Sequence, residues 1–379
     1  MAGNVTVKGW CPGALRPMLS GDGLVVRVRP RFAALSRNQV LALCDAASRF
    51  GTGVIDLTNR ANLQIRGVTE AAWPQLMKLI GEAGLVDDDA ETEGRRNLLV
   101  APDWIDGDDT HRITGLLLNR LNALPSLPAK VGFAIDAGPA PLLSHESADF
   151  RIERSESGAL LVRADGRDKG ALVATPESAV DALIALAHWF VDSGGLDAGR
   201  MRRHDADLPE WAAARISPAQ AARVPALGIH PAGTLYGLIF GQVDAGNLRA
   251  AVEQTNAKGM RVTPWRRLIL EGGIPGLPCS GLVLDNSAPE LNADACAGAP
   301  GCEQATVATR ELARQLSGAV EGHLHVSGCS KGCARRLASD ICVTGREGRY
   351  DVIFKGRADG EPDITGLTAS QLLEYFGVK

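Results

Sequence analysis

Aromatic residues are scarce in this chain of 379 residues, because Phe, Trp and Tyr together make up only 4% of it. Proteins that bind single-stranded nucleic acid stack the bases on aromatic side chains, so this scarcity argues against that class. A positive net charge is also absent, since the formal charge is -4 at pH 7. A general nucleic-acid binder has a basic surface, and we therefore expect no nucleic-acid partner.

The sequence has neither a leader pattern nor a long apolar run. The N-terminal residues MAGNVTVKGW lack a charged segment followed by an apolar one, and no apolar stretch approaches the length of a membrane span. We therefore expect no membrane partner and a cytoplasmic location. The reducing cytosol argues against disulfides among the eight cysteines.

A weak internal repeat organises the chain, whose 45% of hydrophobic residues are enough for two or three domains. Each copy has the pattern of a strand, a helix and a further strand pair: residues 21–30, 35–51 and 53–67 in the first copy, and 231–241, 245–259 and 259–273 in the second. The matching residues are Thr58, Leu63 and Gly67 in the first copy and Thr263, Leu268 and Gly272 in the second. Two such half-domains facing each other would create a cleft, and repeat interfaces commonly bind ligands.

Four cysteines near the C-terminal end form two pairs, Cys296 and Cys302 at Cys-x5-Cys spacing and Cys329 and Cys333 at Cys-x3-Cys spacing. Each pair lies in a glycine-rich sequence, ACAGAPGC or SGCSKGC, whose small residues let the backbone fold closely around an inorganic cluster. We interpret the four residues as thiolate ligands of an iron–sulfur cluster. Residues 303–318 are expected to form an amphipathic helix whose N-terminus points at the cluster and favours its negative charge.

Structural zinc is the main alternative for these cysteines, but zinc pairs are usually tighter, as in Cys-x2-Cys. Two further cysteines, Cys44 and Cys342, lie in apolar periodic contexts and are expected to be buried small hydrophobes. Cys11 lies on an expected loop and is a candidate for facing the active site. The sequence leaves the roles of Cys11 and Cys279 open.

The arginines of the first copy supply a second chemical pattern. A strand over residues 57–67 would place four polar side chains on one face at period two: Arg60, Asn62, Gln64 and Arg66. The neighbouring strand adds Arg27 and Arg29. Arginine binds carboxylates through two parallel hydrogen bonds, so the array predicts a cradle for a ligand with several carboxylate arms. A solvated sheet face is the alternative, and the nearby redox centre, which needs a substrate, favours the cradle.

These residues resemble a known family. The cysteine pattern, the sequences VSGCSKGCARR and ACAGAPGC, the segment LTNRANLQIRG and the duplicated half-domain are similar to those of the nitrite and sulfite reductase superfamily. Within it, GWCPGALRPM followed by GDGLVVRVRP, and TPWRRLIL in the second copy, resemble the precorrin-3B synthase family. The resemblance covers nearly the whole chain, and its motifs are specific in combination.

The resemblance implies an oxygen-dependent step of aerobic cobalamin biosynthesis, in which the tetrapyrrole precorrin-3A is hydroxylated and an acetate arm closes to a γ-lactone. It implies a 4Fe-4S cluster and a mononuclear non-haem iron that activates dioxygen, with NADH as the ultimate electron donor. No Gly-x-Gly-x-x-Gly follows a strand in this sequence, so we expect a separate reductase or ferredoxin to deliver the electrons. The macrocycle would occupy the place where related reductases hold siroheme.

A siroheme-dependent assimilatory sulfite or nitrite reductase is the alternative function. The resemblance implies that reductases grip their anionic substrate with a lysine-x-lysine strand, whereas the corresponding segment here keeps Lys130 and has Gly132 at the second position. Arg266 and Arg267 stand where the reductases tend to carry amides, and they add charge suited to a polycarboxylate. Both departures favour the precorrin substrate. Cys333, which in the reductases bridges the cluster to the siroheme iron, is retained, so siroheme stays the alternative cofactor.

The mononuclear iron has only weak candidates. Oxygen-activating non-haem iron commonly uses two histidines and a carboxylate. Among the seven histidines, His323 and His325 share one face of the strand that leads to Cys329 and are the geometric candidates. A pair of surface histidines is the alternative reading. No catalytic residue is assigned from the sequence.

We therefore expect a monooxygenase of mixed architecture, α+β and α/β, with duplicated ferredoxin-like half-domains forming a substrate-binding domain and α/β lobes, one of which carries the cluster. The expected boundaries are residues 1–86 for the first half-domain, 87–217 for the first lobe, 218–278 for the second half-domain and 279–379 for the cluster lobe. The acidic runs at 87–89 and 103–109 are typical of solvated loops. An electron carrier without a substrate, or a structural zinc protein, would explain the cysteines but neither the arginines nor the duplication.

Overall fold

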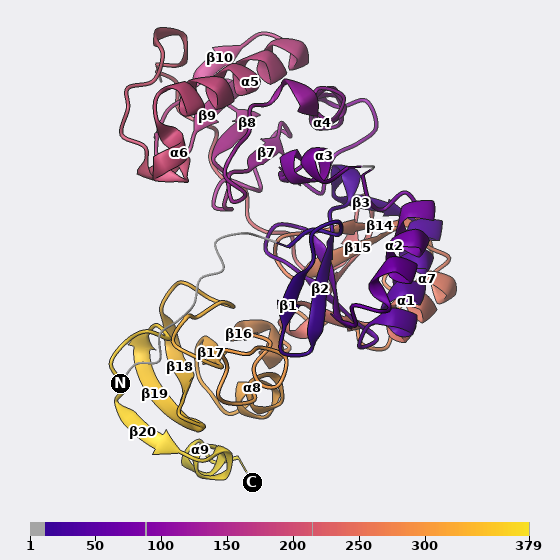
Figure 1. Cartoon of the computed structure of the whole chain (residues 1–379), viewed down its shortest axis with the longest axis vertical. Coiled ribbons are helices and arrows are strands. Elements are labelled where there is room, and N and C mark those ends of the chain that lie inside the picture. The colour runs from indigo at the N-terminus through magenta and orange to yellow at the C-terminus, as the bar shows by residue number, and fades with distance from the viewer. Residues whose placement is uncertain (1–11, 88, 214, 379) are drawn as a thin grey trace.

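The computed structural model describes residues 12–87, 89–213 and 215–378, which form four five-stranded sheets with helices packed against them. Two of the sheets belong to the repeat and lie next to each other at the centre of the molecule. One lobe lies above this pair and another below it (Figure 1). The predicted mixed α/β class is confirmed by this architecture.

The first sheet of the repeat has the order β1-β2-β5-β4-β13, with every neighbouring pair antiparallel. Its strands are β1 (Met18–Ser20), β2 (Gly23–Val28), β5 (Leu63–Val68), β4 (Val54–Leu57) and β13 (Gln242–Asp244). Helices α1 (Arg37–Phe50) and α2 (Trp73–Glu82) belong to this copy. A capping box between Ser36 and Gln39 starts α1, because each side chain satisfies a backbone N–H of the other. The helix buries Cys44, as predicted.

The second sheet of the repeat has the order β11-β12-β15-β14-β3. Its strands are β11 (Gly228–His230), β12 (Gly233–Gly237), β15 (Arg267–Glu271), β14 (Gly259–Val262) and β3 (Ala34–Ser36). Helix α7 (Ala245–Gln254) follows β13 and is capped by Asp244, whose side chain accepts a hydrogen bond from the N–H of Asn247. The two copies share unusual backbone detail as well, since Phe32 and Phe240 occupy equivalent short 3-10 turns at φ 59° and φ 54°.

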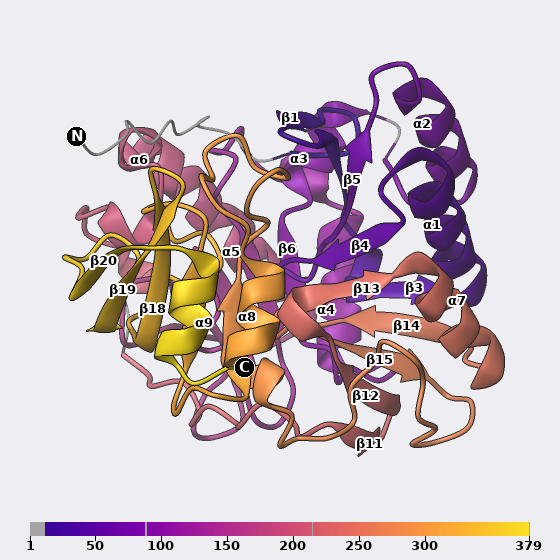
Figure 2. The same cartoon turned by 90° about the horizontal axis from the view of Figure 1, so that it is seen from below.

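The two copies exchange their edge strands. Strand β3 of the first copy pairs with β14 of the second, with Leu35 opposite Met260. Strand β13 of the second copy pairs with β4 of the first, with Val243 opposite Ile55. Helices α1 and α7 lie side by side along the outer face of the pair (Figure 2). Backbone hydrogen bonds therefore fix the position of one half-domain relative to the other.

The upper lobe is a sheet of order β10-β9-β8-β7-β6. Its strands are β6 (Leu98–Val100), β7 (Phe133–Asp136), β8 (Phe150–Arg154), β9 (Leu160–Ala164) and β10 (Ala171–Val173). Its helices are α3 (Ala90–Arg95), α4 (Asp109–Leu118), α5 (Pro176–Asp192) and α6 (Gly195–Ala198). The core of the lobe includes a row of fully buried aromatic rings, Phe133, Phe150 and Phe190, with ring centroids about 6 Å apart.

The lower lobe is a sheet of order β16-β17-β18-β19-β20. Its strands are β16 (Ala293–Ala295), β17 (Leu324–Ser327), β18 (Ser339–Arg346), β19 (Arg349–Gly356) and β20 (Ile364–Leu367), and its helices are α8 (Arg310–Ser317) and α9 (Ala369–Tyr375). The first three strands are parallel, so their carboxyl ends meet at one edge. Ligands of open α/β sheets gather at that edge. The division of the chain at residues 86, 217 and 278 stays a prediction.

The sequence expectations for residues 303–318 and 87–89 were wrong. The helix expected over 303–318 begins only at Arg310, because the preceding residues bond to the cysteine loops: the N–H of Ala305 donates to the carbonyl of Cys302 and that of Thr306 to Gly328. The acidic run at 87–89 is not simply solvated. Asp87 is 7% exposed and accepts hydrogen bonds from two arginine side chains, Arg96 (2.8 Å) and Arg31 (3.0 Å).

Within the described residues, no helix is both long enough and apolar enough to cross a membrane. The seven cysteines of that part of the chain are all free thiols. Cys342 is fully buried, as predicted. Cys11 lies outside the described residues, so its expected place near the active site stays a prediction.

One buried carboxyl group in the upper lobe lacks a full set of partners. Asp136, at the end of β7, is 3% exposed; its Oδ2 accepts a hydrogen bond from the N–H of Leu143 (2.6 Å). Its Oδ1 is buried without a hydrogen-bond partner. Burial raises the pKa of Asp136 to about 7, which the Leu143 N–H only partly opposes.

We expect this carboxyl group to make the stability of the protein fall with rising pH. Its folded-state pKa is raised, so its contribution to stability is fully present below its ordinary pKa and is lost as pH rises through about 7. Asp136→Asn keeps an oxygen for Leu143 and removes the ionisation. Thermal unfolding should therefore show the variant gaining stability over the parent as pH rises from about 4 to about 8. The exposed Asp197→Asn is the control. A stability difference between Asp136→Asn and the parent that does not change with pH would contradict the assignment.

Candidate functional site

Strand β5 and the turn before it carry four of the predicted cradle residues. The expectation of one strand over 57–67 is wrong in its first half, because β4 ends at Leu57 and β5 begins only at Leu63. The hydroxyl of Thr58 closes the turn between them by accepting hydrogen bonds from the N–H groups of Arg60 (3.3 Å) and Asn62 (3.2 Å). Arg60 and Asn62 therefore do not extend the row that Gln64 and Arg66 form on the strand.

The turn end of this segment contacts the upper lobe. Arg60 donates from Nη1 to the side-chain oxygen of Asn97 (3.4 Å) and from Nη2 to the backbone carbonyl of Lys130 (3.1 Å). A narrow crevice at this contact is lined by Arg60, Asn97 and Gly132 among others. The structure thus brings together Arg60 and the Lys130 segment, which the sequence predicted separately as substrate contacts. The side chain of Lys130 is exposed.

A cavity of about 350 Å³ lies beside this contact, between the start of the first half-domain and the upper lobe. Its charged lining consists of Arg16, Arg29, Arg95, Glu91 and Glu93, and its apolar lining comes mainly from the loop over residues 124–133. The predicted cradle residue Arg29 is 9% exposed and donates from Nη1 to the backbone carbonyl of Glu93. Sequence reasoning missed Arg16 and Arg95, since neither lies in a periodic polar row.

Glu93 holds the N-terminal segment at the wall of this cavity. Its carboxylate is buried at 4% exposure and accepts hydrogen bonds from the N–H groups of Ala14 (2.6 Å) and Leu15 (3.1 Å). A side chain at Gly13 would meet the same carboxylate, since its Cβ would lie 2.9 Å from Oε1. This buried acid therefore adds two hydrogen bonds to those that the segment accepts from Arg27 and Trp73.

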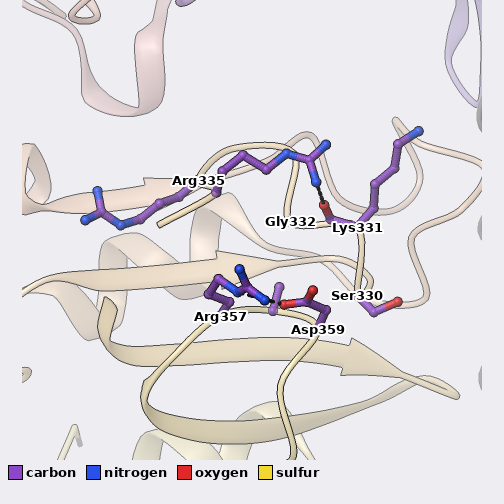
Figure 3. A pocket seen from close by; sticks show the side chains of 8 residues that line it. Ser330, Lys331, Gly332, Arg335, Arg357 and Asp359 are labelled. Atoms are coloured by element: carbon purple, nitrogen blue, oxygen red, sulfur yellow. Dashed lines mark hydrogen bonds and ion pairs between the residues drawn. The ribbon is translucent and has the colours of Figure 1, made fainter. Parts of the chain in front are cut away.

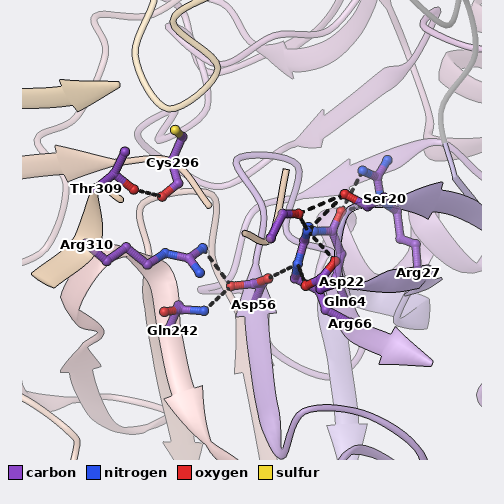
Figure 4. Close-up of polar contacts among 11 residues, drawn as sticks. Ser20, Asp22, Arg27, Asp56, Gln64, Arg66, Gln242, Cys296, Thr309 and Arg310 are labelled. Atoms are coloured by element: carbon purple, nitrogen blue, oxygen red, sulfur yellow. Dashed lines mark hydrogen bonds and ion pairs between the residues drawn. The ribbon is translucent and has the colours of Figure 1, made fainter. Parts of the chain in front are cut away.

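The other end of β5 contacts the cysteine-bearing lobe. Arg66 donates from Nε and Nη2 to the two carboxylate oxygens of Asp22, both at 2.9 Å, and from Nη2 to the hydroxyl of Ser20 (3.1 Å) (Figure 4). The same Nη2 donates to the backbone carbonyl of Gly301. Gly301 lies between the two cysteines of the first pair. The guanidinium predicted to bind substrate is thus engaged by protein groups.

Two neighbouring interactions complete this polar row. Arg27 of β2 donates to the side-chain oxygen of Gln64 (2.8 Å), across the register that places these two residues opposite each other. Asp56 of β4 accepts from Arg310 at the start of α8 (3.1 Å) and from Gln242 of the second copy (2.7 Å), as drawn in Figure 4. Asp56 therefore joins both copies to the lower lobe.

In the second copy, the predicted arginines also contact protein groups. Arg266, at φ 57° in the turn before β15, donates to the backbone carbonyls of Ala293 and Ala334, both at 3.3 Å. It also forms an ion pair with Asp294. Arg267 donates to the backbone carbonyl of Pro225. These two side chains do not join Arg29, Arg60 and Lys130, which lie at the upper lobe.

The four C-terminal cysteines lie in one neighbourhood, beyond the carboxyl ends of β16 and β17. The N–H of Gly328 donates to Sγ of Cys296 (3.2 Å). Burial raises the pKa of the Cys329 thiol, and the nearby Cys296 and Cys302 raise it further. Desolvation raises the pKa of the Cys333 thiol, and Cys296 and Cys329 add to this effect. These mutual electrostatic effects show that the four thiols lie near one another.

Glycines let the two cysteine loops approach each other closely. Gly298 has φ 66°, and a Cβ there would lie 2.5 Å from the hydroxyl of Thr309. A Cβ at Gly328 would lie 2.6 Å from Cβ of Ala305. Both positions follow the sequence prediction that small residues allow close folding here. The assignment of these four thiols to a four-iron cluster, in which each thiolate would bind a different iron, stays a prediction.

Of the candidate histidines, His325 lies on β17 and His323 lies directly before the strand. His325 is fully buried, and its Nδ1 lies 3.5 Å from Sγ of Cys342. Burial lowers the pKa of His325 to about 4, so its ring is neutral at neutral pH. Its Nε2 is buried without a hydrogen-bond partner, as is Nδ1 of His323.

The described residues do not complete a mononuclear iron site around this pair. The adjacent carboxylate, Asp294, lies 3.3 Å from Nε2 of His323 but is also paired with Arg266 and Arg335. Two arginines at the same carboxylate disfavour a bound cation. Within residues 12–87, 89–213 and 215–378, no group of three or more His, Cys, Asp or Glu side chains is arranged to hold a single metal ion. The assignment of His323 and His325 to iron stays a prediction without a third ligand.

A cationic pocket of about 170 Å³ lies next to the second cysteine pair (Figure 3). It is lined by Ser330, Lys331, Gly332, Arg335, Arg336, Arg357, Ala358 and Asp359. Only one of its four cationic side chains, Arg357, is paired with the single carboxylate of the lining, Asp359 (3.2 Å). Arg335 and Arg336 follow Cys333 and Ala334 in the motif VSGCSKGCARR, but the sequence predicted no role for them.

Comparisons with known proteins agree with this arrangement. The family model described as "Nitrite/Sulfite reductase ferredoxin-like half domain" matches residues 16–83, which form most of the first copy. A precorrin-3B synthase from a Sinorhizobium species is 32% identical over 397 aligned residues, which cover 94% of this chain and 84% of the relative. The chain belongs to the precorrin-3B synthase family.

Two further matches to this precorrin-3B synthase family member are more distant: one is a reductase and the other is a solved structure. A ferredoxin–nitrite reductase from Synechococcus elongatus is 24% identical and covers 96% of this chain and 88% of the relative. The solved structure of the NirA protein of Mycobacterium tuberculosis has a TM-score of 0.57 and covers 93% of this chain and 79% of that chain. Its sequence identity is 18%, so this likeness concerns the fold alone.

We expect Glu93→Ala to loosen the segment at the cavity wall in this family member. The substitution leaves two backbone N–H groups without an acceptor, and each buried unsatisfied donor costs about 1–3 kcal/mol. Amide hydrogen exchange at residues 13–16 should accelerate at least about tenfold. Glu91→Ala is the matched control, because that side chain is exposed and pairs only with Arg95. Equal exchange in the two variants would show that Glu93 does not hold the segment.

Proposed function

We propose that the chain catalyses the hydroxylation of precorrin-3A with closure of an acetate arm to a γ-lactone, giving precorrin-3B in aerobic cobalamin biosynthesis. One observation carries the proposal: in a member of the precorrin-3B synthase family, β5 and the turn before it join the crevice beside the arginine-lined cavity to the cysteine loops. Arg60 in the turn contacts the carbonyl of Lys130, and Arg66 on β5 contacts that of Gly301. A macrocycle bound along this segment would contact both the upper lobe and the cysteine loops.

Three cations at the upper-lobe end are proposed to bind the carboxylate arms of the substrate. Arg29 lines the cavity, Arg60 lies at the adjoining crevice, and Lys130 extends from the same contact. The cavity of about 350 Å³ is at the small end of ligand sites, which span ~300–1,000 Å³, so it suits arms of the ring and not the whole ring. Charge-assisted hydrogen bonds from arginine orient such arms in a fixed geometry.

Cys296, Cys302, Cys329 and Cys333 are proposed to hold a 4Fe-4S cluster. When bound, the cluster supplies electrons singly. The protein's part is to keep four thiols together in loops whose glycines leave room for the inorganic core. Burial raises the pKa of the Cys329 and Cys333 thiols, so metal binding at these thiols would release protons. The described residues show no complete site for a second iron, so we derive no step through one.

The electrons are proposed to arrive from a separate protein, a reductase or ferredoxin, with NADH as the ultimate donor. Insertion of one atom of dioxygen and reduction of the other to water requires two electrons. The cationic pocket with Lys331, Arg336 and Arg357 lies beside the second cysteine pair and suits an acidic donor. Lys331 and Arg336 lie on or next to the loop that bears Cys329 and Cys333, so a docked donor would be close to the cluster.

A siroheme-dependent reductase is disfavoured by the residue that replaces the second lysine of the reductase strand. The position of the second lysine of the reductase strand is Gly132, and a Cβ at this glycine would lie 2.8 Å from the side-chain nitrogen of Asn97. A long cationic side chain there would require Asn97 to move. The nitrite reductase relative from Synechococcus is also the more distant one, at 24% identity.

The spectrum of protein purified without oxygen tests this choice. We expect a broad brown absorption at the edge of the visible blue, together with iron and acid-labile sulfide, and no red chlorin band. A strong red band would transfer the assignment to a siroheme reductase. Conversion of precorrin-3A to its lactone with a chemical or enzymatic electron donor is the direct test of the proposed reaction.

We expect Cys329→Ser to remove the cluster, because hydroxyl oxygen is a poor ligand for iron–sulfur assemblies. Iron and acid-labile sulfide should fall to background, and turnover should be lost. Cys342→Ala is the matched control, since this thiol is fully buried but lies outside the cysteine loops. Retention of iron and sulfide by the serine variant would remove Cys329 from the ligand set.

We expect Lys130→Gln and Arg60→Gln to weaken the binding of precorrin-3A by about tenfold to a hundredfold, because each removes a charged hydrogen-bond donor. Cluster content should not change. Lys78→Gln on α2 is the control, since this exposed lysine is paired with Glu82. Fluorescence or absorbance titration of the macrocycle gives the dissociation constants, and unchanged affinity in both variants would place the substrate elsewhere.

A further inference from the structure

Each copy of the repeat places one guanidinium group on one cysteine loop. Arg66 of the first copy donates to the carbonyl of Gly301, directly before Cys302. Arg266 of the second copy donates to the carbonyl of Ala334 (3.3 Å), directly after Cys333. The two cysteine pairs are thus contacted separately, one pair by each half-domain.

Both guanidinium groups have a carboxylate partner of their own. Arg66 binds both oxygens of Asp22 at 2.9 Å, and Arg266 is paired with Asp294. The arginine side chains are 14% and 27% exposed, and their carboxylate partners 20% and 10%. A guanidinium whose fork is occupied by a protein carboxylate has little left to offer a substrate carboxylate. These contacts argue against the substrate role that the sequence predicted for Arg66 and Arg266.

The contacted loops need such support. They contain several glycines, including Gly298 and Gly301 in the first and Gly332 in the second, and glycine loses more conformational freedom on ordering than any other residue. The hydroxyl of Ser20 adds a second hydrogen bond to the carbonyl of Gly301 (2.9 Å). A Cβ at Gly21 would overlap the carbonyl oxygen of Pro300, so the β1–β2 turn lies directly on the first loop.

We propose that Arg66 and Arg266 are positioning residues that hold the two cysteine loops in place, one loop for each half-domain, before any cluster is inserted. Ordering a loop costs conformational entropy, and the two arginines supply this order from β5 and from the turn before β15. The inference goes beyond the proposed reaction, although its second test rests on the proposed cluster. Neither arginine is assigned to substrate or to the reacting atoms.

Hydrogen exchange of the cluster-free protein tests the proposal without reference to the cofactor. In Arg66→Gln, we expect amide exchange over residues 297–305 to accelerate about tenfold or more, while exchange over residues 330–336 stays as in the parent. Arg266→Gln should show the reverse pattern, so each variant is the control for the other. Arg267→Gln is a further control, since this side chain donates to the carbonyl of Pro225, which lies in neither cysteine loop.

An unchanged exchange pattern, or equal acceleration in both loops of either variant, would overturn the proposal. Should Arg66→Gln fail to fold, Ser20→Ala removes the hydroxyl that donates to the carbonyl of Gly301 and accepts from Arg66, and it serves the same comparison. Selective acceleration over residues 297–305 in Ser20→Ala supports the positioning role, and its absence in a folded Ser20→Ala protein counts against it.

The second test uses the protein with its iron and sulfide. Both glutamine variants should lose iron to a chelator several-fold faster than the parent, and Arg66→Lys should restore part of the retention. Affinity for precorrin-3A should stay within about twofold of the parent. A large fall in that affinity with normal exchange and iron retention would return these arginines to substrate binding. Absence of any cluster would defeat the proposed function, while the exchange result would still decide the positioning role.

Discussion

The exchange of edge strands between the two copies is the constraint on which the rest of the molecule depends. Because β3 completes the sheet of the second copy and β13 completes that of the first, backbone hydrogen bonds fix the two half-domains relative to each other. Both lobes then attach to this fixed pair. The turn before β5 abuts the upper lobe through Arg60, and Arg66 with Arg266 reaches the cysteine loops.

This arrangement explains why residues of one type take different roles. Arginines at the upper lobe line a cavity together with acidic and apolar groups. Those at the lower lobe are paired with carboxylates and donate to backbone carbonyls. The difference lies in their neighbours, since a partly exposed guanidinium beside a cavity can bind an anion, whereas one with Asp22 across its fork acts as a structural cross-link.

Much of the fold and part of the site could be predicted from the sequence. Periodic segments indicated the repeat. The pairing of Cys296 with Cys302 and of Cys329 with Cys333 in glycine-rich loops indicated that the four cysteines lie near one another. The partners of individual arginines could not be predicted. Asp22 and Asp56 lie far from Gly301 and Arg310 in the sequence, and Glu93 acts through backbone N–H groups of distant residues, for which no periodicity exists.

The strand exchange also bears on how such a chain could have arisen and how it could be divided. A product of residues 1–217 alone would carry β3 without its partner β14 and would leave β4 as an open edge, the kind of surface that recruits other chains. The complementary piece would have the converse defect at β14. Mixed together, the two pieces present matching vacant edges, so the exchanged strands make each half of this duplicated protein the natural folding partner of the other.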